Sequence, residues 1–307
     1  MRAAVLYERG ATPEVAEFDD PTPTDGQVVV EVGVAGANPV DLAIASGAFG
    51  DPQLPYVVGR EGVGSLADGR RVYFNSPSSP FGSWAPRTLV DPGQTFAVPD
   101  AVADGVAVAI GIAGLAAWVP LQWHARLRSG ERVLVLGATG VVGQIAVQAA
   151  RLLGAGRIVG AGRNRDALSR LAGLGADATV ALGGDDDGAA LKAEAGEGYD
   201  VVIDTVYGAP FLAALGATAV GARLVTIGAG AAGSAEVPFR DLQGRAHIGH
   251  GNQLTPREVL CDSYAQLCRH AAAGEIAVEI ERFELDRAPQ AWQAQAAGPN
   301  HKLVIIP

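Results

Sequence analysis

Residues 133–155, VLVLGATGVVGQIAVQAARLLGA, contain the clearest indication of the fold. This stretch begins with the apolar residues of a buried strand and ends with the Ala- and Leu-rich pattern of a helix. Glycines at 137, 140 and 143 lie between the two. They would let the backbone approach a pyrophosphate, which the helix N-terminus binds through free N–H groups and its positive dipole. A tight strand-to-helix turn without a nucleotide would give the same pattern, so the surrounding sequence has to decide.

Short apolar segments recur after this stretch and alternate with helical patterns such as those at 143–154 and 165–175. Repeated strand–helix units with fully apolar strands predict a doubly wound parallel α/β sheet that is covered on both faces. We therefore expect a Rossmann domain over residues 103–251. Its predicted strands are RVLVLG (132–137), RIVGAG (157–162), DATVAL (177–182), DVVIDTV (200–206), ARLVTIG (222–228) and the weaker RAHIGHG (245–251).

The segments on either side have a different character. VVVEVGVAG (28–36) has the alternation of a strand, and Pro and Gly punctuate residues 48–105 as in short strands and turns. After Gly251, residues 256–274 predict one helix, followed by strands at VEIERFEL and KLVIIP. The first hundred residues therefore predict a second, β-rich domain.

Composition limits the classes of function. A chain of 307 residues with 49% hydrophobic and 18% charged residues is typical of a compact two-domain enzyme. The net charge of −10 argues against nucleic acid or an anionic membrane as a partner. MRAAVLYERG (1–10) has no apolar signal core, so we expect a cytoplasmic protein. Cys261 and Cys268 are two helical turns apart, too far for a disulfide, and there is no cysteine cluster for a structural zinc.

The end of the second predicted Rossmann strand indicates which dinucleotide is bound. Enzymes that prefer NAD place Asp or Glu there to bind the ribose hydroxyls. This chain has Gly162, Arg163, Asn164 and Arg165, with no acid before them. A guanidinium matches a phosphate monoester, whereas two exposed arginines at a helix start would be unusual by chance because helix N-termini favour acids. We therefore predict NADP(H), bound mainly by Arg163 with help from Arg165.

Several motifs in order resemble the medium-chain dehydrogenase/reductase superfamily, and within it the zinc-free quinone oxidoreductase branch. They cover essentially the whole chain: MRAAVLYERG, GVAGANPVDLAIASG, PYVVGREGVG, IAGLAAW, GATGVVG, GYDVVIDTVYG, ARLVTIG and HKLVIIP. The resemblance implies a GroES-like, mainly β catalytic domain made of residues 1–102 and 252–307, with the Rossmann domain inserted and the active site in the cleft between them. It also implies a homodimer that pairs through a Rossmann edge strand, here RAHIGHG.

The strand ends and the resemblance together give the predicted site. The predicted substrate-cleft residues are Asp41, Tyr56 and Trp84, although core packing would also explain the tryptophan. The predicted cofactor-binding residues are Thr139, Gly140, Val141, Val142, Gly143, Gly162, Arg163, Asn164, Arg165, Thr205, Ile227, Gly228, Ala229, Gly251 and Asn252.

The metal-ligand positions of the family argue against zinc. Zinc relatives carry Cys-Gly-Thr/Ser-Asp where this chain has residues 38–41, Asn-Pro-Val-Asp, and Gly-His-Glu where it has residues 59–61, Gly-Arg-Glu. Asparagine is a poor zinc ligand and arginine cannot be one, while Val40 replaces the hydroxyl that relays protons. Many quinone reductases also have hydroxyls where this chain has Ala43 and Ala116, so the substrate class is less well defined than the cofactor.

We predict an enzyme that transfers hydride from NADPH to a quinone or an α,β-unsaturated carbonyl compound without zinc. Asn38 and Arg60 are the predicted catalytic residues, donors that stabilise negative charge on the acceptor oxygen. Alternatively, Glu61 or Asp41 neutralises Arg60, which then only braces its loop. In either case the final proton can come from water. A second hypothesis is an NADPH-binding sensor or structural protein with little turnover.

Overall fold

The computed structural model describes residues 1–24 and 26–307, which form two units. The first unit comprises residues 1–112, 264–273 and 278–307, and the second comprises 113–263 and 274–277. Both boundaries lie about ten residues later than the expected 102/103 and 251/252. The first lies later because helix α2 (Asp104–Ala109) packs on strands of the first unit. The second lies later because Tyr264 stacks on Tyr73 of that unit, with ring centroids 4.8 Å apart.

The second unit contains a six-stranded sheet whose neighbouring strands are all parallel. The strand order is β11-β10-β9-β12-β13-β14, which confirms the predicted α/β class and all six predicted strands. The strands are β9 (Arg132–Leu136), β10 (Arg157–Gly162), β11 (Ala178–Ala181), β12 (Tyr199–Asp204), β13 (Thr218–Thr226) and β14 (Ala246–Gly249).

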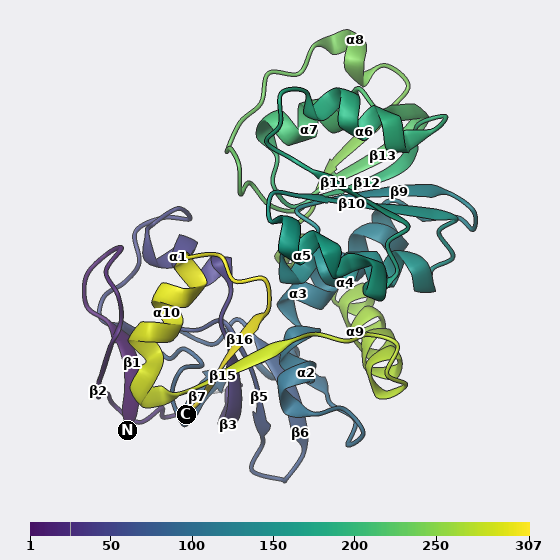
Figure 1. Cartoon of the computed structure of the whole chain (residues 1–307). Coiled ribbons are helices and arrows are strands. Elements are labelled where there is room, and N and C mark those ends of the chain that lie inside the picture. The colour runs from purple at the N-terminus through teal and green to yellow at the C-terminus, as the bar shows by residue number, and fades with distance from the viewer. Residues whose placement is uncertain (25) are drawn as a thin grey trace. The chain divides into compact units, whose positions relative to one another are not determined.

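Helices cover both faces of this sheet, as fully apolar strands require. Figure 1 shows α4 and α5 on one face and α6 and α7 on the other. The segment expected to form one helix at 165–175 forms α5 followed by a separate 3₁₀ turn, η3. The helical elements of this unit are α3 (Ile112–Val119), the π-helical turn η2 (Pro120–His124), α4 (Val141–Leu152), α5 (Arg165–Ser169), η3 (Leu171–Leu174), α6 (Asp187–Ala195), α7 (Gly208–Leu215), α8 (Phe239–Leu242) and η4 (Asn252–Leu254). Helix α9 (Arg257–Ala272) has residues in both units.

The first unit is mainly β and is built from both ends of the chain. Its larger sheet has the order β15-β16-β3-β5-β6-β8, with β7 also paired to β3, and its smaller sheet has the order β2-β1-β4. The strands are β1 (Arg2–Leu6), β2 (Glu14–Glu17), β3 (Val28–Gly36), β4 (Tyr56–Val57), β5 (Glu61–Ser65), β6 (Arg71–Asn75), β7 (Arg87–Val90), β8 (Thr95–Ala97), β15 (Ile280–Glu284) and β16 (Lys302–Ile306). The helical elements are α1 (Pro39–Ala45), η1 (Pro92–Gln94), α2, η5 (Leu285–Arg287) and α10 (Ala288–Ala296).

Three segments far apart in sequence meet in this unit: the end of β3, the start of β5 and the start of β16. Gly36 is required at the meeting point, because a Cβ there would lie 2.5 Å from Glu61 Oε1. The turn from β3 into α1 and the first residues of β5 and β16 are therefore held close together. The polar cluster described below occupies this place.

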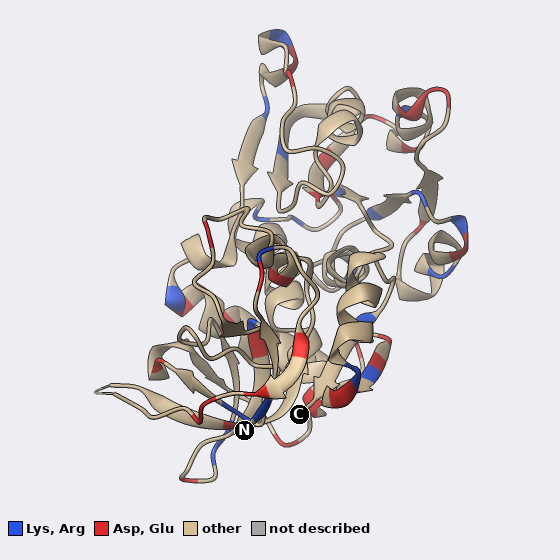
Figure 2. Cartoon of the chain, turned by 90° about the vertical axis from the view of Figure 1, so that its left-hand side faces the viewer, with Lys and Arg blue, Asp and Glu red and all other residues tan. Residues whose placement is uncertain are grey.

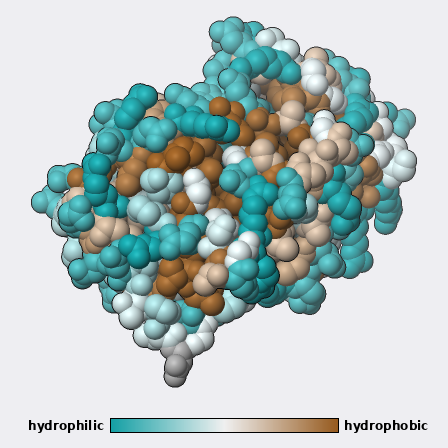
Figure 3. Space-filling model, turned by 90° about the horizontal axis from the view of Figure 1, so that it is seen from below, coloured by the Kyte–Doolittle hydropathy of each residue, from teal (hydrophilic) through white to brown (hydrophobic). Residues whose placement is uncertain are grey.

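The surface carries charges of both signs. Acidic and basic residues are interspersed along helices and loops (Figure 2), and hydrophobic areas on the face drawn in Figure 3 are bordered by hydrophilic residues. The most exposed large hydrophobic residues in the described part of the chain include Val220 (87%), Leu254 (80%) and Phe239 (78%). Among the described residues, no helix is long and apolar enough to cross a membrane.

Candidate functional site

The predicted cofactor residues gather at one edge of the parallel sheet. Residues 139–143 follow β9, 162–165 end or follow β10, Thr205 follows β12, 227–229 follow β13, and 251–252 follow β14. Because these strands are parallel, their carboxyl ends share one edge, which is where open α/β sheets bind ligands. The structure therefore brings together the residues that the sequence assigned to the dinucleotide.

The turn after β9 is as tight as the glycine pattern requires. Gly137 has a φ of +72°, and a Cβ there would lie 2.1 Å from Thr205 Oγ1. A Cβ on Gly143 would lie 2.3 Å from the carbonyl oxygen of Gly137. Gly140 is the N-cap of α4 and provides no side-chain cap for the first-turn N–H groups. These features fit a pyrophosphate, which would accept hydrogen bonds from that turn.

The end of β10 presents two exposed cationic side chains, Arg163 and Arg165. The structure shows no hydrogen bond or ion pair of either guanidinium within the described residues. Both are therefore available to a phosphate. Asn164, in contrast, caps α5, because its Oδ1 accepts the N–H of Ala167 at 3.0 Å.

Two other predicted cofactor residues have structural partners. The hydroxyl of Thr205 donates to the carbonyl oxygen of Leu136 at 3.0 Å, which ties β12 to β9. Oδ1 of Asn252 lies 2.9 Å from Nε2 of His250. Nδ1 of His250 lies 3.1 Å from Nε2 of His124. Burial lowers the pKa of His250 to about 4, so this imidazole is neutral at physiological pH.

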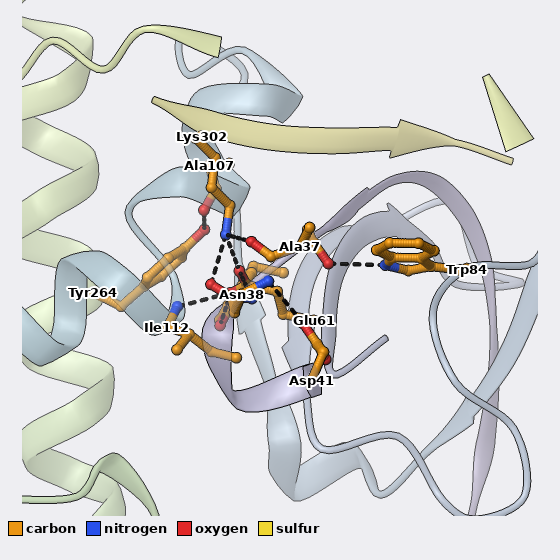
Figure 4. A network of polar contacts seen from close by, with 11 residues as sticks. Ala37, Asn38, Asp41, Glu61, Trp84, Ala107, Ile112, Tyr264 and Lys302 are labelled. Carbon is orange, nitrogen blue, oxygen red and sulfur yellow. Dashed lines mark hydrogen bonds and ion pairs between the residues drawn. The ribbon is translucent and has the colours of Figure 1, made fainter. Parts of the chain in front are cut away.

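The first unit contains a buried polar cluster centred on Glu61 and Lys302 (Figure 4). Their side chains are 0% and 1% exposed, and Lys302 Nζ lies 2.7 Å from Glu61 Oε1. The same ammonium donates to Asn38 Oδ1 at 2.8 Å and to the carbonyl oxygen of Ala37 at 3.1 Å. The N–H donors of the ammonium therefore all meet acceptors, which is what a charge needs in order to be buried.

Glu61 receives further hydrogen bonds from three different elements. Asn38 Nδ2 donates to Oε1 at 2.8 Å, while the Tyr73 hydroxyl and the Ile112 N–H donate to Oε2 at 2.9 Å and 2.7 Å. Burial raises the pKa of Tyr73 well above its usual range, and the Glu61 carboxylate adds to this shift, so Tyr73 stays a donor. Glu61 is thus the hub of the cluster.

A pocket of about 150 Å³ opens beside this cluster. Asp41, Tyr56 and Arg60 line it, together with apolar residues such as Val57 and Phe81. Burial raises the pKa of Asp41 to about 7; the Asn38 N–H opposes this rise, Glu61 adds to it, and Lys302 and Arg60 oppose it. Burial, followed by the charge of Asp41, raises the pKa of Tyr56 to about 12, while Arg60 opposes that rise.

Arg60 keeps its charge uncompensated by close contact. Its guanidinium donates to Ser76 Oγ at 2.8 Å, and no carboxylate of the described residues forms an ion pair with it. Glu61 is bound to Lys302 instead, and Asp41 Oδ2 accepts the N–H of Asn38 at 2.8 Å. The alternative in which Glu61 neutralises Arg60 is therefore not what the structure shows.

Two predicted site residues lie elsewhere than expected. Trp84 is 0% exposed, does not line the pocket, and donates its indole N–H to the carbonyl oxygen of Gly36 at 3.0 Å. It packs edge-on against Trp292 in the core, which corrects its assignment to the substrate cleft. Asn38 is 5% exposed, and its amide is bonded to Glu61 and Lys302. It organises the buried cluster rather than presenting its amide to the pocket.

Lys302 is the residue that sequence reasoning missed. The chain has only two lysines, Lys192 and Lys302. A lysine among the apolar residues of a terminal strand is unusual enough to have signalled a buried partner.

Within the described part of the chain, no three His, Cys, Asp or Glu side chains are grouped as a metal site would need.

Comparisons with known proteins agree with this architecture. A family model described as zinc-binding dehydrogenase matches residues 141–250, which lie in the second unit. A quinone oxidoreductase of Pongo abelii is 36% identical over 169 residues, 50% of each chain. A mycocerosic acid synthase-like polyketide synthase of Mycobacterium tuberculosis is 33% identical over 230 residues, 71% of this chain and 11% of that protein.

Among solved structures, the quinone oxidoreductase of Thermus thermophilus, determined alone and with NADPH, is 28% identical. It superposes with a TM-score of 0.86 over 100% of both chains. In sequence alignment, the chain spans about half the length of the Pongo abelii quinone oxidoreductase that it matches. The family model covers neither Asn38 nor Arg60, so its description does not bear on a metal at those positions.

Proposed function

Because the chain belongs to the medium-chain dehydrogenase/reductase superfamily, in its quinone oxidoreductase-like branch, we propose that it is an NADPH-dependent oxidoreductase. Its acceptor is a quinone or an α,β-unsaturated carbonyl compound, and it works without zinc. The observation that carries the proposal is the sheet edge where the glycine turn after β9 lies beside the uncompensated arginines after β10. The Thermus thermophilus relative was solved with NADPH, which supports the same cofactor here.

NADPH supplies the hydride when it is bound, so the protein has to bind, orient and stabilise charge. The first-turn N–H groups at Val141, Val142 and Gly143 would hold the pyrophosphate. Arg163, helped by Arg165, would hold the 2′-phosphate, since a guanidinium forms two parallel bonds with such an anion. Residues 227–229 and 251–252 lie on the same edge and would contact the rest of the cofactor.

The chemistry of the buried cluster supports a site without catalytic zinc. Arg60 cannot ligate a metal, and the Asn38 oxygen already accepts from Lys302 at 2.8 Å. Lys302 also places a positive charge 2.7 Å from Glu61, which would repel a divalent cation brought close to it. The cation that serves the reaction is then Arg60, which lines the pocket with a free charge and can hold an acceptor oxygen as negative charge develops.

Turnover with a panel of quinones and enals tests this proposal. We expect NADPH oxidation with at least one acceptor, no stoichiometric zinc in the purified protein, and activity that survives a chelator. Tight NADPH binding without oxidation in the presence of any acceptor would instead favour a sensor or structural protein. One zinc per chain, with activity that vanishes on its removal, would contradict the zinc-free proposal.

We also propose a homodimer that forms through β14. This strand pairs only with β13 among the described strands, so its other edge has free backbone groups. Antiparallel pairing of two such edges would extend the sheet across a twofold axis. Sedimentation equilibrium should therefore give twice the chain mass of 31.3 kDa.

A further inference from the structure

One of the two carboxylate oxygens of Asp41 accepts a hydrogen bond, and the other has no partner among the described residues. Oδ2 accepts the N–H of Asn38 at 2.8 Å, at the start of α1. Oδ1 is buried and has no hydrogen-bond partner within the described part of the chain. The side chain also lines the pocket that Tyr56 and Arg60 line. A buried polar atom without a partner is unfavourable, so its position calls for a ligand in the pocket or for a proton of its own.

The charged groups that act on Asp41 lie on β5, just before β5 and on β16. Glu61 on β5 opposes ionisation of Asp41, whereas Lys302 on β16 and Arg60, just before β5, favour it. Tyr56 on β4 also lies within electrostatic reach. Burial outweighs these charges and raises the pKa of Asp41 to about 7, so a large fraction carries a proton near neutral pH. That proton belongs on Oδ1, because Oδ2 is already an acceptor.

We propose that Asp41 is the acid of the reduction, and that its Oδ1 hydroxyl protonates the acceptor oxygen that Arg60 holds. This assignment rests on the proposed function. The hydride brings both electrons to the acceptor and leaves negative charge on its oxygen. The O–H bond of Asp41 then breaks as the O–H bond of the acceptor forms, giving a hydroquinone or an enol. NADP⁺ leaves as the oxidised product, and the Asp41 carboxylate regains a proton from water.

The neighbours of Asp41 in the pocket are less suited to this step. An acid works best when its pKa is close to the working pH. Tyr56 holds its proton too strongly, since burial and the charge of Asp41 raise its pKa to about 12. Arg60 does not release a proton at all, so its part is to fix the oxygen by charge. The pocket thus offers one anchoring cation and one acid.

The test compares Asp41→Asn with a matched control, Asp187→Asn. Asparagine keeps an acceptor for the Asn38 N–H but has no acidic proton. Asp187, the first residue of α6, also accepts backbone N–H groups, those of Gly183 and Gly184, but it is only partly buried and lies in the second unit. The first readout needs neither NADPH nor acceptor: the carboxyl carbons of ¹³C-labelled aspartates are followed by NMR as the pH changes. We expect one resonance that titrates near pH 7 in wild type and Asp187→Asn and is missing from Asp41→Asn.

The second readout is the pH profile of quinone reduction at saturating NADPH. Wild type and Asp187→Asn should lose activity above about pH 7 and show a solvent isotope effect. Asp41→Asn should bind NADPH normally, lose about 10²-fold in kcat, and show neither the pH dependence nor the isotope effect.

Three results would overturn the assignment. The first is an Asp41 resonance that titrates below about pH 5. This measurement uses wild-type protein, and any folded variant at position 41 identifies the resonance by its absence. The second is an Asp41→Asn enzyme with the kcat and pH profile of wild type. The third is a wild type that reduces no acceptor; this contradicts the proposed function, and the assignment fails with it. An active wild type separates the first two failures from the third.

Discussion

Replacement of Lys302 by Met removes the charge from the buried cluster and keeps most of the apolar stem. The ammonium lies 2.7 Å from Glu61 Oε1, and both side chains are almost completely buried. At an effective dielectric constant of about 20, this attraction is worth about 6 kcal/mol before desolvation. Loss of one partner of a buried pair typically lowers stability by about 3–5 kcal/mol. We expect about 3 kcal/mol, because Asn38, Tyr73 and Ile112 still donate to Glu61.

The chain provides its own control in Lys192, its only other lysine, which is exposed on α6. Lys192→Met should change the free energy of unfolding by less than about 0.5 kcal/mol. Hydrogen exchange of peptides from β3, β5 and β16, compared with peptides from β9 and β12, separates the two units. Lys302→Met should accelerate exchange only in peptides from β3, β5 and β16. The double variant Lys302→Met/Glu61→Gln should lose much less free energy of unfolding than the sum of the losses in the two single variants. A Lys302→Met protein as stable as Lys192→Met would refute the role given to the cluster.

Three further predictions concern single sites. Arg60→Met should lower kcat by about 10²-fold with little change in NADPH affinity. Ser76→Ala removes the hydrogen bond of Arg60 but keeps its charge, so it should lower kcat much less. An equal loss of kcat in both variants would show that Arg60 only braces the loop. Folding raises the pKa of Asp41 from 3.8 to about 7. Between these two pH values the folded state binds more protons than the unfolded state, so the free energy of unfolding falls as the pH rises. Wild type should lose up to about 4 kcal/mol relative to Asp41→Asn between about pH 4 and pH 7, and parallel urea-midpoint curves would contradict this. Ile248→Pro on β14 should yield monomers by sedimentation, and an intact dimer would exclude that edge.

The fold was predictable because local patterns and topology agree. Six apolar strands separated by helical segments allow few arrangements other than a parallel sheet, and the glycines after β9 lie at the edge where we propose that the dinucleotide binds. The unit boundaries were less predictable. They depend on which core α2 and the ring of Tyr264 join, which is decided by tertiary contacts rather than by composition.

The candidate site was predictable only where a local motif carries the chemistry. The glycines and arginines lie where strand ends place them, so counting along the chain suffices. The partners of Asn38 come from Glu61 and from Lys302, 264 residues away, and no local pattern encodes such a distance. The burial of Trp84 depends in the same way on Trp292. The polar residues of the site could therefore be identified from the sequence, but which of them face the pocket could not.

Binding titrations with NADPH and with NADH show whether this chain is built for NADPH. Arg163→Ala is compared with wild type and with Arg240→Ala, which removes an exposed arginine from α8 of the same unit. A charge-assisted contact with the 2′-phosphate contributes about 1.5–3 kcal/mol, roughly ten- to a hundred-fold in Kd. Arg163→Ala should weaken NADPH by that factor and leave NADH nearly unchanged, while Arg240→Ala should leave both unchanged. Equal weakening of NADPH and NADH binding by Arg163→Ala, or a wild type that prefers NADH, would show that the chain does not select NADPH through its 2′-phosphate.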